Sequence, residues 1–144
     1  MRLRLTTQAR ERRWCFLRCG AIMASMKIEG SCHCGAVQIE VARAPTNVTS
    51  CNCSICRRLG TLWAYYSPSD VKIAGSTATY RWGDKTIDFH RCAACGCVTH
   101  WSPLPGRAAD RMGVNARLLA PEVLASARVR RLDGASDDWK YLDD

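Results

Sequence analysis

The sequence predicts a mainly β domain whose short strands are held together by metal sites. Short segments rich in Val, Ile, Thr and aromatic residues recur along the chain, separated by turns that contain Gly, Pro or Asp. Seven cysteines gather in three tight clusters, within 32–34, 51–56 and 92–95. Thiols spaced by one or two residues converge on a space the size of a metal ion, which predicts cross-links between strand ends.

The chain of 144 residues has the length of one domain, preceded by an extension of different composition. Residues 1–25 carry six arginines against one glutamate and show no strand period. We expect this basic extension to be disordered, or to lie upstream of an authentic start at Met23 or Met26. An organelle transit peptide and a mobile basic arm are the alternatives. The zinc domain is expected over 26–144.

The domain begins with a clear alternation. Val37, Ile39 and Val41 are separated by polar Gln38 and Glu40, which predicts a half-buried strand. β-branched and aromatic residues predict further strands over 46–50, 62–67, 71–73, 77–82, 86–91, 98–101, 111–116 and 127–132. Short helical turns are expected over 54–59, inside the second cluster, and over 121–124, where Pro stands at the first helical position.

The first and third clusters predict a closed, structural zinc site. Residues i and i+2 of an extended strand point to the same side, so Cys32 and Cys34 are expected to bind one ion from one face. Cys92 and Cys95, followed by Gly96, form a zinc knuckle in which backbone N–H groups point at sulfur. Four thiolates complete the coordination of Zn²⁺. The site would join the start of the domain to its middle.

The middle cluster supplies only three ligands, Cys51, Cys53 and Cys56. Three protein ligands with one open position are the pattern of a catalytic zinc. Thiolate ligands suit the binding of another soft ligand, such as a substrate thiol, and zinc deprotonates a thiol that it binds. A fourth thiolate would add negative charge, and Arg57 and Arg58 follow directly as compensating cations. This coincidence predicts a thiol substrate.

Other arrangements of the cysteines are open on the residues alone. Cys97, or one of His33, His90 and His100, would close the second site if it came near the three thiols. Ten cysteines would also suit a disulfide scaffold, but no convincing secretory signal precedes them. Iron–sulfur ligation fits the CxCxxC spacing poorly. We therefore expect a cytoplasmic protein with two Zn²⁺ per chain.

The net charge of +8 does not predict nucleic-acid binding. The extension accounts for +5, and 15 basic against 12 acidic residues leave +3 from Met26 onward. Seven thiolates holding two Zn²⁺ would remove this excess, and no basic stripe with interleaved aromatic residues remains. No apolar run approaches the ~20 residues of a membrane-spanning helix. We expect neither a membrane nor a nucleic acid as partner.

Several segments together carry a resemblance to a known family. They are residues 30–37 (GSCHCGAV), 51–60 (CNCSICRRLG) and 92–96 (CAACG), with 114–119 (VNARLL) and 132–134 (LDG) downstream. Over about 27–140 the chain resembles the glutathione-dependent formaldehyde-activating enzyme family, whose domain also occurs in centromere protein V. The resemblance implies a zinc-stapled β architecture similar to the Mss4-like fold. It implies structural zinc at Cys32, Cys34, Cys92 and Cys95, and catalytic zinc at Cys51, Cys53 and Cys56.

The resemblance also implies an activity, the condensation of glutathione with formaldehyde to S-(hydroxymethyl)glutathione, formally carbon–sulfur lyase chemistry. We expect the three-cysteine zinc to capture the thiol, and Arg57 or Arg58 to balance charge and bind a glutathione carboxylate. The thiolate would add to a small aldehyde, or the adduct would break apart in reverse. The alternative is a non-catalytic binding module with two structural zinc sites. A thiol-based metal or redox sensor that uses Cys97 is a weaker one.

Overall fold

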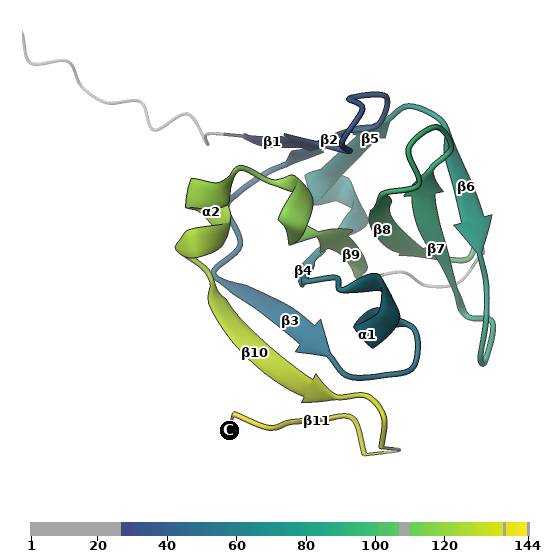
Figure 1. Cartoon of the computed structure of the whole chain (residues 1–144), viewed down its shortest axis with the longest axis vertical. Helices are drawn as coiled ribbons and strands as arrows, with labels where there is room; N and C mark the ends of the chain where they lie inside the picture. The colour runs from purple at the N-terminus through teal and green to yellow at the C-terminus, as the bar shows by residue number, and fades with distance from the viewer. Residues whose placement is uncertain (1–26, 107–109, 137, 144) are drawn as a thin grey trace, which may run out of the picture.

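The computed structural model describes residues 27–106, 110–136 and 138–143, so the basic extension over 1–25 lies outside the described part. The described chain forms a small sheet, with the strand order β1-β2-β5, and a large one, with the order β11-β10-β3-β4-β9-β8-β7-β6 (Figure 1). The strands are β1 (Ile28–Ser31), β2 (Gln38–Val41), β3 (Asn47–Cys51), β4 (Trp63–Tyr66), β5 (Val71–Ala74), β6 (Thr77–Tyr80), β7 (Ile87–Cys92), β8 (Val98–Pro103), β9 (Met112–Asn115), β10 (Arg128–Asp133) and β11 (Lys140–Tyr141). The helices are α1 (Cys56–Leu59) and α2 (Pro121–Ala125), and 3-10 turns occur at Pro68–Asp70 and Ala116–Leu118.

The prediction of a mainly β fold is confirmed, and every predicted strand is present with ends that move by at most two residues. Strand β2 buries Ile39 and Val41 and exposes Gln38, as the alternation predicted. Both helical turns form, α1 inside the second cysteine cluster and α2 at Pro121. The sequence interpretation missed β1 and β11. Strand β1 contains a glycine and β11 has only two residues, so neither shows a local pattern.

The main hydrophobic core joins the small sheet to the middle of the large one. It contains Ile39 and Val41 from β2, which pack with Val48 of β3 and Val114 of β9. A second cluster of buried residues is built around cysteines and aromatic rings, and contains Cys51, Cys53, Cys56, Trp63 and Phe89. The middle cysteine cluster is therefore part of the packed interior, held between α1 and strands of the large sheet.

One long-range pairing determines what surrounds the middle cluster. Strand β10 pairs with β3 in parallel, although about eighty residues separate them in the chain. Its register places Arg131 beside Ser50 and Leu132 beside Cys51. The loop that follows β10 therefore begins where β3 ends, at the first cysteine of the cluster.

A stacked histidine pair is formed by half-buried His90 of β7 and buried His100 of β8. The rings of His90 and His100 lie 4.0 Å apart, centroid to centroid, and His100 is only 6% exposed. The Nδ1 atom of His100 is 3.0 Å from the hydroxyl of Thr99, and that of His90 is 3.1 Å from the hydroxyl of Thr77. Burial, with a smaller contribution from His90, lowers the pKa of His100 to about 4.

This low pKa predicts acid sensitivity that a single substitution should reduce. His100 is neutral in the fold but takes up a proton in the unfolded chain below about pH 6.5, so stability falls as the pH drops from about 6.5 towards about 4. We expect His100 to contribute about 1 kcal/mol of the loss between pH 7 and 5.5. Urea unfolding of wild type and His100→Asn at both pH values measures it. Equal losses in the two proteins would contradict the assignment.

Candidate metal sites and the adjoining pocket

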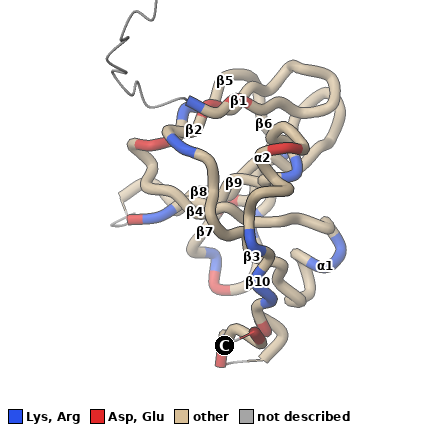
Figure 2. Tube along the Cα trace, turned by 90° about the vertical axis from the view of Figure 1, so that its left-hand side faces the viewer, with Lys and Arg blue, Asp and Glu red and all other residues tan. Residues whose placement is uncertain are grey.

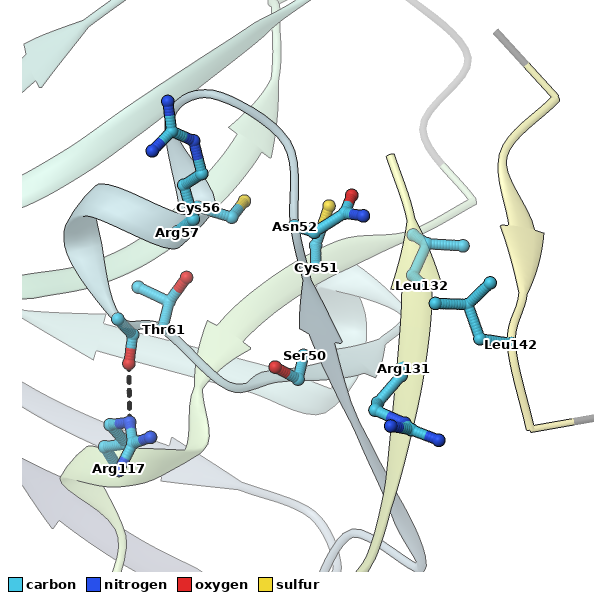
Figure 3. A pocket seen from close by; sticks show the side chains of 11 residues that line it. Ser50, Cys51, Asn52, Cys56, Arg57, Thr61, Arg117, Arg131, Leu132 and Leu142 are labelled. Atoms are coloured by element: carbon cyan, nitrogen blue, oxygen red, sulfur yellow. Dashed lines mark hydrogen bonds between the residues drawn. The ribbon is translucent and has the colours of Figure 1, made fainter. Parts of the chain in front are cut away.

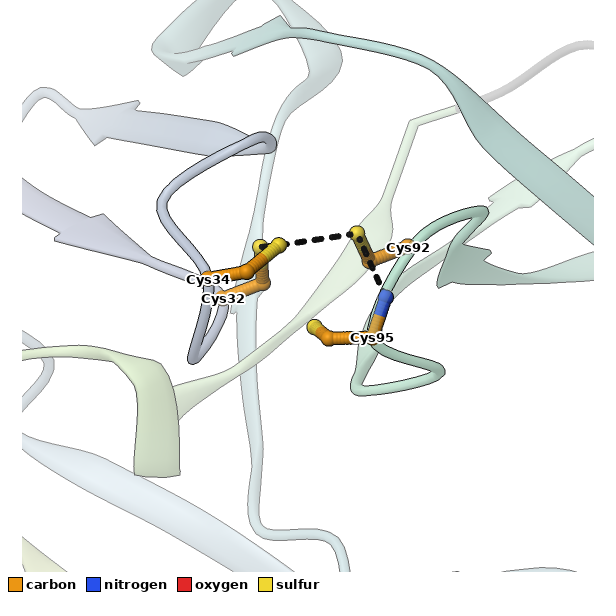
Figure 4. Close-up of side chains that lie close together, drawn as sticks. All are labelled: Cys32, Cys34, Cys92 and Cys95. Atoms are coloured by element: carbon orange, nitrogen blue, oxygen red, sulfur yellow. Dashed lines mark hydrogen bonds between the residues drawn. The ribbon is translucent and has the colours of Figure 1, made fainter.

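Four cysteine thiols converge between the small sheet and the end of β7. Cys32 and Cys34 lie in the turn between β1 and β2, Cys92 ends β7, and Cys95 lies in the turn to β8 (Figure 4). The sulfur of Cys34 is 3.6 Å from that of Cys32 and 3.7 Å from that of Cys92. Metal–sulfur bonds of about 2.3 Å in a tetrahedron place sulfur atoms about 3.8 Å apart, so the spacing fits a four-thiolate metal site.

Backbone N–H groups surround these sulfur atoms. Val37 donates to the sulfur of Cys32 at 3.2 Å, and the backbone N–H of Cys95 donates to the sulfur of Cys92 at 3.5 Å, as expected for a knuckle. The hydrogen bond from Val37 lowers the pKa of Cys32, and the backbone N–H of Cys97 is the largest cause that lowers the pKa of Cys95 to about 5. These donors stabilise the thiolate form that binds metal.

The expected extended conformation of the paired cysteines is wrong. Cys32 starts a tight turn in which the N–H of Gly35 bonds to the Cys32 carbonyl at 3.0 Å. Cys51 ends a strand, but Cys53 lies in the bend that follows it. A turn brings two sulfur atoms together over a shorter path than a strand and leaves the next N–H groups free to point at them, which explains the difference.

The second group consists of Cys51, Cys53 and Cys56, whose sulfur atoms lie within 4.8 Å of one another. Cys51 comes from the end of β3 and Cys56 from the start of α1, and all three side chains are buried. The indole Nε1 of Trp63 donates to the sulfur of Cys56 at 3.2 Å. The hydrogen bond with Cys56 is the largest cause that lowers the pKa of Cys51 to about 6, and the same bond raises the pKa of Cys56.

No other His, Cys, Asp or Glu among the described residues joins this group of three. Cys97 packs instead against the four-cysteine site, beside Cys32 and Cys92. His90 and His100 are engaged in their own stack. The candidates that would have closed the second site are therefore not gathered there, and the seven cysteines divide into four and three as the spacing predicted.

A pocket of about 310 Å³ opens directly beside the three-cysteine group (Figure 3). This volume lies at the lower end of the range of about 300–1,000 Å³ for small-molecule sites. The wall includes Cys51 and Cys56, so two of the three thiols face the space in which a ligand would lie. The remaining lining residues are Ser50, Asn52, Arg57, Gly60, Thr61, Arg117, Arg131, Leu132 and Leu142.

Three arginines contribute to the wall of the pocket. Figure 2 shows basic residues on α1 and along β10, and Arg57, Arg117 and Arg131 line the pocket. Arg131 pairs with Asp143 at 2.8 Å, whereas no carboxylate of the described chain pairs with Arg57 or Arg117. Arg58 does not line the pocket, and its guanidinium donates to the Ser54 carbonyl at 2.5 Å. Sequence reasoning missed Arg117 and Arg131, which only the strand pairing brings here.

The loop after β10 covers the three-cysteine group. Asn52 secures it, because its amide donates to Asp133 at 2.7 Å and its carbonyl oxygen accepts from the N–H of Ala135 at 2.8 Å. A Cβ atom at Gly134 would lie 2.5 Å from the Cys51 sulfur and 3.2 Å from the Cβ of Cys53. Only glycine therefore fits here, and sequence reasoning gave it no role in the site.

This contact predicts that Gly134→Ala removes metal from the second site alone. The new methyl group has to displace the Cys51 sulfur or the loop, so we expect at least about a tenfold loss of metal affinity at that site. Metal content after dialysis against a chelator should fall to one ion per chain. Gly30→Ala is a matched control, because its Cβ meets the Leu118 carbonyl oxygen at the same 2.5 Å but no sulfur. Two ions retained in Gly134→Ala would contradict the prediction.

Two comparisons place this arrangement among known proteins. A family model described as "Glutathione-dependent formaldehyde-activating enzyme" matches residues 27–129. A crystal structure of a Rhodobacter sphaeroides protein, a structural genomics target, is similar in fold with a TM-score of 0.58 and 32% sequence identity. The similarity covers 71% of this chain and 99% of that one. In the described residues, the structure contains no helix that is long and apolar enough to cross a membrane.

Proposed function

Because this chain belongs to the glutathione-dependent formaldehyde-activating enzyme family, we propose that it joins a thiol to a small aldehyde at the three-cysteine group. The proposed thiol is glutathione and the proposed aldehyde is formaldehyde. The product would be S-(hydroxymethyl)glutathione, and the reverse reaction would release both. The observation that carries the proposal is the position of three buried thiols, without a fourth ligand among the described residues, in the wall of a basic pocket.

We propose zinc as the metal of both groups. Thiolate-only ligands select soft or borderline metals, and sulfur spacings of 3.6 and 3.7 Å suit tetrahedral zinc at the four-cysteine site. A zinc ion in the three-cysteine site would supply an open position at which a substrate thiol binds and loses its proton. The four-cysteine site would have a structural role, since its ligands join the small sheet to the large one.

The protein's own residues would bind and orient glutathione around that position. Glutathione carries two carboxylates, and the pocket presents two arginines, Arg57 and Arg117, without a carboxylate partner in the described chain. Arg117 is held in place by its bond to the Gly60 carbonyl at 2.5 Å, whereas the Arg57 guanidinium has no hydrogen bond or ion pair within the described part of the chain. Apolar Leu132 and Leu142 would cover the carbon chain of the ligand on the opposite wall.

The experiment measures how fast formaldehyde exchanges with S-(hydroxymethyl)glutathione at equilibrium, by exchange NMR, above the rate without protein. We expect the zinc-loaded protein to accelerate the exchange. Arg57→Met should raise the KM for glutathione about tenfold, the value of one charge-assisted hydrogen bond, but leave 2-mercaptoethanol unaffected because it has no carboxylate. Arg58→Met is the matched control, one residue away and outside the pocket. No acceleration by the wild-type protein would contradict the proposal.

A further inference from the structure

One buried hydroxyl group has no hydrogen-bond partner. Thr61 is only 4% exposed, and its Oγ1 is the one buried side-chain oxygen or nitrogen in the described chain that lacks a partner. Buried polar groups are nearly always paired, because an unpaired one loses its hydrogen bonds to water without replacement. The unpaired hydroxyl therefore costs free energy in the free protein, and a ligand that forms a hydrogen bond with it would remove this cost.

Thr61 lies at the end of the pocket that Cys51 and Cys56 line. Figure 3 shows its oxygen pointing towards the side on which Cys56 lies. The chain reaches this position through Gly60, which caps α1 in the left-handed conformation (φ 62°) and bonds through its N–H to the Cys56 carbonyl at 2.9 Å. The turn at Gly60 thus brings Cys56 and Thr61 to the same wall of the pocket.

The neighbours of Thr61 hold it firmly. Arg117 binds the Gly60 carbonyl on one side, and on the other the Leu62 carbonyl accepts from the N–H of Ala116 at 2.8 Å. The nearby amide of Asn52 uses one N–H donor and its oxygen to hold the 133–135 loop, so its orientation is fixed by the fold. Thr61 is therefore a positioned, neutral group with a hydrogen bond to give.

We infer that the Thr61 hydroxyl binds the aldehyde oxygen and stabilises it as the carbon–sulfur bond forms, which would make Thr61 a catalytic residue. The inference rests on the proposed function. The thiolate sulfur gives an electron pair to the carbonyl carbon, the C=O π pair moves to oxygen, and this oxygen takes a proton from water in place of the one the thiol released. A hydroxyl suits the position, because it donates to the developing alkoxide and accepts from the hydroxyl of the product.

The test compares Thr61→Val, which keeps the shape of the side chain, with Thr61→Ser, which keeps the hydroxyl. We expect Thr61→Val to slow the exchange of formaldehyde with S-(hydroxymethyl)glutathione by at least about tenfold. Thr61→Ser should stay within about fivefold of wild type, and both should bind two zinc ions and glutathione as wild type does. If Thr61 had only a structural role, Thr61→Val would not lower the exchange rate while leaving glutathione binding unchanged.

A second measurement uses stability in the free protein. Because Oγ1 of Thr61 has no partner there, Thr61→Val should unfold at the same or a higher urea concentration than wild type. Thr99→Val is the matched control, since the buried Thr99 hydroxyl bonds to the His90 carbonyl at 3.3 Å and to His100, and it should unfold at a lower concentration. A clear loss of stability in Thr61→Val would show that the hydroxyl is already paired and overturn the inference.

The outcomes separate this inference from the proposed function. If wild type and Thr61→Val accelerate the exchange equally, the role of Thr61 is wrong and the proposed function stands. If wild type gives no acceleration, the proposed function fails and the role of Thr61 fails with it. If Thr61→Val and Thr61→Ser lose activity to the same extent, the hydroxyl is not the group that matters.

Discussion

Replacing Cys92 by alanine is expected to unfold the protein. The Cys92 side chain is fully buried at the end of β7, 3.7 Å from the sulfur of Cys34, so its loss leaves three thiols that cannot close the four-cysteine site. Structural zinc sites contribute about 10 kcal/mol of apparent folding free energy, which is comparable to the whole free energy of unfolding of a domain of this size. Circular dichroism and the dispersion of amide NMR signals should show a largely unfolded chain.

Cys97→Ala is the control for this result. Cys97 packs against the same site but does not belong to either group of candidate ligands. It should therefore stay folded and retain two zinc ions, since its backbone carbonyl, which accepts from Cys92 at 2.9 Å, is unchanged. A folded and soluble Cys92→Ala protein would refute the structural role of the four-cysteine site, whatever Cys97→Ala does.

Replacing Cys53 by serine is expected to abolish the acceleration of exchange while the fold survives. Cys53 is buried within the group of three, and two thiols with a hydroxyl bind zinc far less tightly than three thiolates. The four-cysteine site lies elsewhere in the fold and should keep its ion, so elemental analysis should give one zinc per chain instead of two. The near-isosteric change leaves the surrounding packing of Trp63 and Phe89 intact.

Two results for Cys53→Ser would contradict the proposed role of the three-cysteine group. Activity that persisted in a folded protein with one zinc would show that the three-cysteine group is not the site of reaction. Loss of the fold together with both ions would show that the second site is structural, which is the binding-module alternative.

The convergence of the cysteines within each cluster was predictable, because it depends on local spacing. Cysteines two or three residues apart can hardly avoid meeting, so the three-cysteine group follows from the sequence. The meeting of Cys34 with Cys92, 58 residues further along the chain, depends on tertiary placement. The strands were predictable for a similar reason, since the burial of Ile39 and Val41 is a local alternation. The second site's lack of a His or Cys97 ligand was not predictable, because it depends on where distant strands place those residues.

The part of the pocket that β10 contributes could not be predicted, because parallel pairing of β3 with β10 joins segments about eighty residues apart. That pairing brings Arg131 and the Gly134 loop to the cysteines, and no local pattern records it. The hydrogen bond from the indole N–H of Trp63 to the Cys56 sulfur also depends on tertiary placement, although the two residues are only seven positions apart in the sequence. The sequence held a signal for Gly134, since a glycine in the LDG segment indicates a close backbone approach. It did not indicate that Cys51 is the residue approached.

The most direct test of the proposed function is X-ray absorption on the zinc-loaded protein, with and without glutathione. Four sulfur ligands at one site and three at the other average 3.5 per zinc ion in the free protein. Glutathione should raise this average to four, because its sulfur fills the open position. An average of four in the free protein, unchanged by glutathione, would mean two closed structural sites and would contradict the proposed function.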